Sequence, residues 1–119
     1  MLGLVMLFAT LVGAVPVAII GWLATAGKLP PNWFAGVRTP YSLSSPERWY
    51  AVHRAAGPYI LYGAVAAAAT GLAFAPFAIA GEVSDGAATA VLLAQAVLLA
   101  GAAVAGAVAG TVRAKREVG

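Results

Sequence analysis

The sequence predicts an all-α membrane protein with three transmembrane helices and a short interfacial helix in the first loop. Of its 119 residues, 62% are hydrophobic and only 9% are charged, whereas a soluble domain carries about 25% charged residues. Three uncharged runs are each longer than the ~20 residues that cross a hydrocarbon core. Every charged residue lies outside these runs. We therefore expect one membrane domain over residues 1–119.

The first span is predicted at residues 2–26. The uncharged stretch that contains it has no basic residue before it and exceeds the 7–15 apolar residues of a cleaved signal peptide, so we expect it to be retained. Pro16 lies near its middle. Because proline has no backbone N–H, we expect a kink there.

The second and third spans are predicted at residues 55–80 and 87–112. Gly57 and Pro58 are expected to bend the start of the second span. Pro76 lies near its end.

Charge between the spans predicts the orientation. The first loop carries four Lys or Arg residues against one Glu, and the tail carries three against one Glu. Residues 81–86 carry two acids and no base. The positive-inside rule places the first loop and the tail in the cytoplasm. The N-terminus is then outside and the C-terminus is in the cytoplasm.

Small residues at four-residue spacing predict close helix packing, because lipid gives helices no hydrophobic reason to associate. The candidate packing residues are Ala67 and Gly71 in the second span and Ala102, Gly106 and Gly110 in the third. Two alternatives are chance spacing in an alanine-rich chain and a homodimer through the last two glycines.

Gln95 is the only amide within the spans. An unpaired amide is unfavourable in hydrocarbon, so we expect it to bond across a helix. The candidate partners are Thr10, Thr70, Tyr59 and Tyr62.

Residues 28–54, here called the motif segment, are dense in polar and aromatic side chains. Pro30 and Pro31 stop the first helix. Asn32 suits a turn, Trp33 and Phe34 have the character of interface anchors, and Gly36 permits backbone conformations or close approaches that other residues resist.

A helix is expected to run from Pro46 through Ala55 and to end there or continue into the second span. Ser44 and Glu47 have the spacing of a capping box. Trp49 and His53 are four residues apart and share a face, as do Tyr50 and Arg54.

The charged side chains of the motif segment allow several interpretations. Arg38 and Arg54 either clamp an anionic group together, extend to lipid headgroups, or donate to loop carbonyls that would otherwise be unsatisfied near the membrane. His53, with a reference pKa of ~6.5, has no acidic, histidine or cysteine neighbour in the sequence, so we expect no metal site. A Ser-His dyad with Ser42, Ser44 or Ser45 is a minor alternative, and we expect no catalytic residue, no enzyme activity and no cofactor.

The motif segment resembles the signature of the SdpI family of bacterial membrane proteins. The matching residues are Pro31, Asn32, Phe34, Gly36, Arg38, Thr39, Pro40, Leu43, Ser44, Trp49, His53, Arg54 and Gly57. The resemblance implies a polytopic domain with this motif between its first two spans. It also implies immunity to a secreted antimicrobial toxin and signalling through a cytoplasmic repressor, as in the best-known member.

Two functions remain as expectations. The first is binding or recognition in toxin resistance or membrane signalling, with a peptide toxin, a lipid headgroup or a cytoplasmic regulator as partner. The second is a non-catalytic accessory subunit of a larger transport or envelope-biogenesis complex. We expect contact with the lipid bilayer and no binding to nucleic acid, which needs a solvated basic face.

Overall fold

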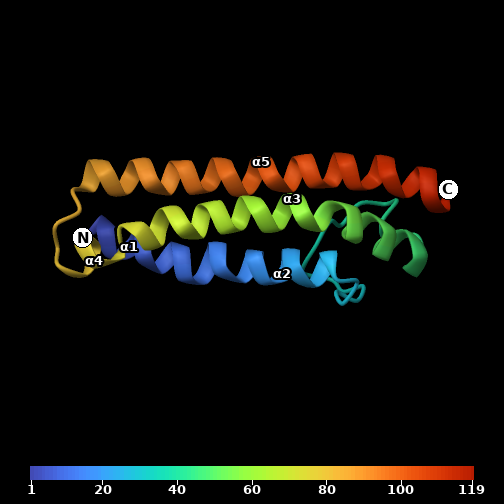
Figure 1. Cartoon of the computed structure of the whole chain (residues 1–119), viewed down its shortest axis with the longest axis horizontal. Helices are drawn as coiled ribbons and strands as arrows, with labels where there is room; N and C mark the ends of the chain where they lie inside the picture. The colour runs from blue at the N-terminus through green and yellow to red at the C-terminus, as the bar shows by residue number, and fades with distance from the viewer.

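The computed structural model describes residues 1–119 and is an elongated bundle of 52 × 20 × 19 Å. Its helices are α1 (Leu2–Ala9), the π-helix η1 (Thr10–Ala14), α2 (Val15–Thr25), α3 (Pro46–Ala73), α4 (Ala75–Ile79) and α5 (Asp85–Val118). Three helical rods run side by side, with α3 between α2 and α5 (Figure 1). The rods are long and apolar enough to cross a membrane. The predicted all-α fold with three transmembrane helices is therefore confirmed.

The first rod consists of α1, η1 and α2, which together form a helix from Leu2 to Thr25. A kink was expected at Pro16. The helix has a π-helical turn there, which ends at Ala14, two residues before the proline. Proline cannot donate to the carbonyl four residues earlier and its ring collides with that carbonyl. The wider π turn removes this conflict and leaves Pro16 in the first turn of α2.

The second rod differs from the predicted span at 55–80. The expected short helix is not separate, because α3 begins at Pro46 and continues through Gly57 and Pro58 to Ala73. The chain then breaks at Phe74, and α4 follows with a proline in its first turn. A missing N–H at Pro76 prevents the next bond of α3, which explains the early end.

Serine residues cap α3 and α5. The capping box expected from Ser44 is wrong, because Ser45 is the N-cap and its side chain accepts the Arg48 N–H at 3.2 Å. Ser84 Oγ accepts the Ala87 N–H at 3.1 Å. The third span is longer than predicted because the basic tail continues the helix, and cations near a helix C-terminus are favourable.

Glycines let α5 approach α3 closely. A Cβ on Gly110 would lie 2.7 Å from the Val52 carbonyl oxygen, and one on Gly106 would lie 3.1 Å from that of Ala56. Ala102 lies one turn before Gly106 and two turns before Gly110, and it packs against Gly63 of α3. Both α5 glycines are buried inside the chain, against α3, and the homodimer considered for this face stays untested.

The contact between α2 and α3 is equally close. A Cβ on Gly21 would lie 2.6 Å from the Leu61 nitrogen, and one on Gly57 would lie 2.5 Å from the Thr25 nitrogen. A packing role for these glycines was not predicted. Their spacing along two different spans has no four-residue pattern that would have revealed it.

All three rods meet at Gln95, which is 4% exposed. Its amide nitrogen donates to Thr10 Oγ1 at 2.7 Å and to the Ala67 carbonyl at 3.0 Å. A Cβ on Gly71 would overlap the Thr10 side chain and lie 2.5 Å from this nitrogen. We call Thr10, Ala67, Gly71 and Gln95 the mid-span junction.

Candidate functional site

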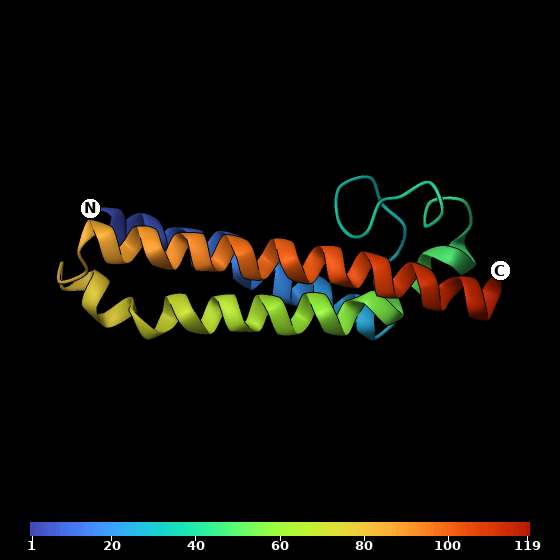
Figure 2. The same cartoon turned by 90° about the horizontal axis from the view of Figure 1, so that it is seen from above.

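The motif segment lies at the end of the bundle that holds the C-terminus. Its loop stands to one side of the rods next to the last turns of α5 (Figure 2). Gly27, with a φ of +70°, ends α2, and the Lys28 N–H donates back to the Leu23 carbonyl at 2.8 Å. A glycine in the left-handed region is the usual way to stop a helix and turn the chain.

Asn32 organises the first turn of the loop. Its Oδ1 accepts the N–H groups of Phe34 at 3.0 Å and Ala35 at 2.6 Å, and its Nδ2 donates to the Pro30 carbonyl at 2.9 Å. The Arg38 guanidinium donates to the Asn32 carbonyl. The turn is thus fixed both by its own side chain and by an arginine that follows it.

This turn presents two aromatic side chains outward. Trp33 is 80% exposed and Phe34 is 72% exposed. Their rings contact each other edge to face, with centroids 5.5 Å apart. A pair of large apolar side chains on a fixed turn is available for contact with a membrane or a protein surface.

His53 connects the loop to α3. Its Nε2 accepts the Val37 N–H at 2.8 Å, and its Nδ1 lies 2.7 Å from the Trp49 carbonyl. Because Nε2 accepts, the ring proton belongs on Nδ1, where it donates to that carbonyl. The imidazole is 1% exposed and stacks on Trp49 at 4.0 Å. Both ring nitrogens are therefore occupied by backbone groups.

Gly36 makes room for this histidine. Its φ is +108°, which disfavours side chains, and an added Cβ would lie 2.5 Å from His53 Nε2. Trp49 is held in turn by its indole N–H, which donates to the Leu29 carbonyl at 2.9 Å. The buried side chains of the motif segment thus support one another.

Ser42 closes the second half of the loop and was not among the predicted motif residues. It is fully buried, and its hydroxyl donates to the Val37 carbonyl at 2.6 Å and accepts the Thr39 N–H at 3.0 Å. The Ser42 N–H donates to Thr39 Oγ1 at 3.1 Å, and Pro40 lies within this turn. A hydroxyl three residues after Thr39, with a proline between them, was the signal available in the sequence.

The Ser-His dyad is wrong. Ser42 bonds to the loop backbone, Ser44 donates to the Tyr41 carbonyl at 2.5 Å, and Ser45 caps α3. None of the three hydroxyls forms a hydrogen bond with His53.

The Tyr41 ring packs beneath two cations, with Arg48 at 4.8 Å and Lys115 at 5.4 Å from its centroid.

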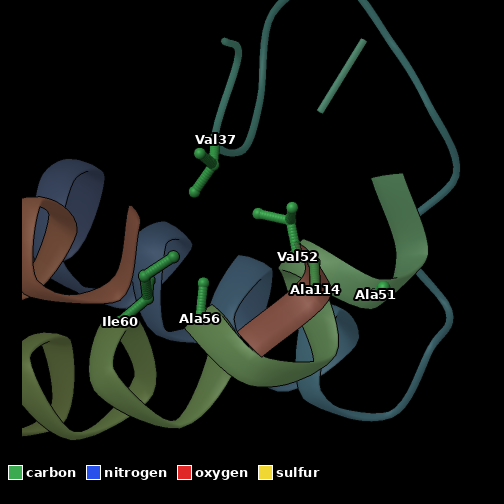
Figure 3. Packing of buried hydrophobic residues seen from close by; sticks show 6 residues of the cluster. All are labelled: Val37, Ala51, Val52, Ala56, Ile60 and Ala114. Carbon is green, nitrogen blue, oxygen red and sulfur yellow. The ribbon is translucent and has the colours of Figure 1, made fainter. Parts of the chain in front are cut away.

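The loop also contributes to the apolar core. Val37 points toward Val52, Ile60 and Ala56 of α3, close to Ala114 of α5 (Figure 3). This cluster holds the loop against both helices. Gly57, the last residue of the resemblance, contacts α2 and has a packing role.

The two arginines considered as a clamp make different contacts. Arg38 donates to the Asn32 carbonyl, whereas Arg54 lines a cleft with Arg113 of α5. The clamp stays a prediction, and the geometry divides the segment in two. Its buried polar side chains shape the loop, while the aromatic pair and Arg54 face outward.

Comparison with known proteins identifies the family of the chain. No curated protein and no solved structure matches the chain. The model of the SdpI/YfhL protein family matches residues 28–111, which is more than half of the chain. That range begins with the motif segment and continues through α3 and most of α5. This multi-pass membrane protein therefore belongs to the SdpI/YfhL family.

Proposed function

We propose that this protein acts by recognition, not catalysis, in toxin resistance or membrane signalling at the bacterial inner membrane. Family membership fits an immunity-type membrane protein. The observation that carries the proposal is the exposed pair Trp33–Phe34 on a turn that Asn32 fixes. A preformed apolar contact loses little entropy on binding.

The proposed orientation indicates which partner the loop meets. The motif segment and the C-terminus lie at the same end of the bundle (Figure 1), and this end carries all seven Lys and Arg residues. By the positive-inside rule this end faces the cytoplasm. The direct partner of the aromatic pair is then a cytoplasmic regulator, and a toxin that arrives from outside would meet residues 80–84 first.

The orientation can be tested because the chain has no cysteine. Glu82→Cys and Glu117→Cys place one thiol at each end of the bundle. A membrane-impermeant maleimide should label Glu82→Cys in intact cells and Glu117→Cys only after lysis. The reverse pattern would overturn the proposed orientation.

The recognition role is tested by Trp33→Ala combined with Phe34→Ala. We expect cells with this variant to lose toxin protection or the signalling response while the protein remains in the membrane in normal amount. A photo-crosslinking residue at position 33 should capture a cytoplasmic protein. The matched control is Phe77→Ala with Ile79→Ala, which removes two exposed apolar side chains from α4 at the other end. Equal phenotypes for the two double variants would contradict the proposal.

An accessory subunit remains the second candidate because of one surface. Between α2 and α3 lies an entirely apolar groove of about 480 Å³, whose lining includes Ile19, Trp22, Leu61 and Val65. A helix of another membrane protein would fit such a surface. Purification in mild detergent distinguishes the two functions, since the subunit function requires a stoichiometric membrane partner that is lost with Leu61→Trp.

A further inference from the structure

A second polar site lies between the last residues of the motif segment, on α3, and the end of α5. It is an open cleft of about 560 Å³ whose lining includes Arg54, Tyr59, Tyr62, Arg113 and Glu117. A neighbouring cleft of about 570 Å³ shares three of these residues and adds Arg116. The two clefts form one continuous surface, which we call the arginine cleft.

We propose that the arginine cleft binds the phosphate group of an anionic phospholipid. Three arginines line it against one carboxylate, so its charge complements a phosphodiester. Guanidinium groups bind phosphate oxygens in a paired geometry that lysine cannot reproduce. This site is separate from the recognition surface at Trp33 and Phe34 and does not depend on its function.

The pairing of charges leaves the cleft open to a ligand. The ion pairs of the chain do not include Arg54 or Arg116. Arg113 pairs with Glu117 at 3.3 Å, but the two side chains are 72% and 47% exposed. An exposed pair of this kind contributes little, so a phosphate can replace Glu117 as the partner of Arg113.

The depth of the cleft matches the headgroup level of a bilayer. Arg54 is the last charged residue before the uncharged part of α3, and Arg113 is the first after the uncharged part of α5. Basic pockets between transmembrane helices at this level are suited to anionic headgroups.

The uncharged wall of the cleft suits the rest of a lipid. Tyr59 is 47% exposed and Tyr62 is 73% exposed. At the rise of an α-helix they lie about 7 and 12 Å further along α3 than Arg54, toward the bilayer centre. Tyrosine rings favour the interface because one end is apolar and the other polar. Pro58 and Ala55 complete an apolar wall beside them. The cleft thus changes from cationic to apolar in the direction that a phospholipid does.

Native mass spectrometry of the delipidated full chain in mild detergent tests the proposal. The protein is titrated with phosphatidylglycerol and, separately, with phosphatidylcholine. Wild type should bind the anionic lipid more tightly. In Arg54→Gln combined with Arg113→Gln, the affinity for phosphatidylglycerol should fall by about 30-fold, because each cation near an anionic surface contributes roughly fivefold. Binding of phosphatidylcholine should not change.

Two further variants separate the site from general charge. Lys28→Gln removes a cation that lies over Trp22 at the same end of the molecule but outside the cleft, and it should leave lipid binding unchanged. Glu117→Gln frees Arg113 and should increase the affinity for phosphatidylglycerol. If Lys28→Gln lowers the affinity for phosphatidylglycerol as much as Arg54→Gln or Arg113→Gln alone, the attraction is non-specific and the proposal is overturned.

Inorganic phosphate distinguishes a lipid from a free anion. Because the apolar wall contributes to lipid binding, a large excess of inorganic phosphate should displace little phosphatidylglycerol. Displacement at concentrations similar to those of the lipid would assign the cleft to free phosphate and would overturn the assignment to a phospholipid. All these variants change exposed side chains, and an unchanged thermal unfolding temperature will show that the fold is retained.

Discussion

The motif segment and the mid-span junction are both held by buried side-chain hydrogen bonds. In the first these bonds satisfy loop backbone groups, and in the second they join helices. In the motif segment, His53, Ser42 and Asn32 bond to backbone groups of a loop that has no regular secondary structure. At the mid-span junction the backbone is already satisfied within helices, and Gln95 joins three rods through one amide.

The difference shows where buried polar side chains are indispensable. The N–H and C=O groups of this loop that are buried inside the protein need partners there, because water does not reach them. Removal of a motif side chain therefore leaves backbone groups without a partner. Removal of Gln95 leaves helices whose internal bonds persist. We thus expect substitutions to cost more at the motif segment, and three variants test this order.

The largest effect is expected for Gly36→Ala. The φ of +108° and the 2.5 Å approach of the new Cβ to His53 act together. We expect the free energy of unfolding to fall by about 3–5 kcal/mol, the sum of backbone strain and a lost buried hydrogen bond. The measurement is SDS titration in mixed micelles, followed by tryptophan fluorescence.

Gly81→Ala is the matched control for this variant. Gly81 also has a positive φ, +75°, but no atom lies within 4 Å of its added Cβ. It should show only the backbone cost, about 1–2 kcal/mol. Equal losses at the two glycines would mean that the approach to His53 contributes nothing.

A smaller loss is expected for His53→Ala. The change leaves the buried Val37 N–H without an acceptor and opens a space beside Trp49. We expect a loss of about 3 kcal/mol in the same titration. His53→Phe keeps a ring on Trp49 but not the hydrogen bonds. If both variants lose the same amount, the hydrogen bonds dominate; if His53→Phe is as stable as wild type, the argument from loop backbone groups fails.

The three spans could be predicted from the sequence because uncharged runs are a property of composition. The start of α3 at Pro46 could also be predicted, but its end at Ala73 could not, since the break before Pro76 depends on proline geometry that composition does not record. Trp49 and His53 could be assigned to one face from their spacing. Their loop partners, Leu29 and Val37, are 20 and 16 residues away, and no local pattern connects positions so far apart.

The smallest of the three effects is expected for Gln95→Leu. The substitution removes the bonds to Thr10 and to the Ala67 carbonyl, but Thr10 keeps its own bond to the Met6 carbonyl at 2.9 Å, and the Ala67 carbonyl stays within α3. Interhelical hydrogen bonds in membranes contribute about 0.6 kcal/mol each on average, so we expect a loss of about 1–2 kcal/mol. Thr70→Val is the control, because Thr70 bonds only to its own helix and should cost less. A loss at Gln95 that exceeds the loss at His53 would reverse the comparison and place the decisive polar contact within the membrane.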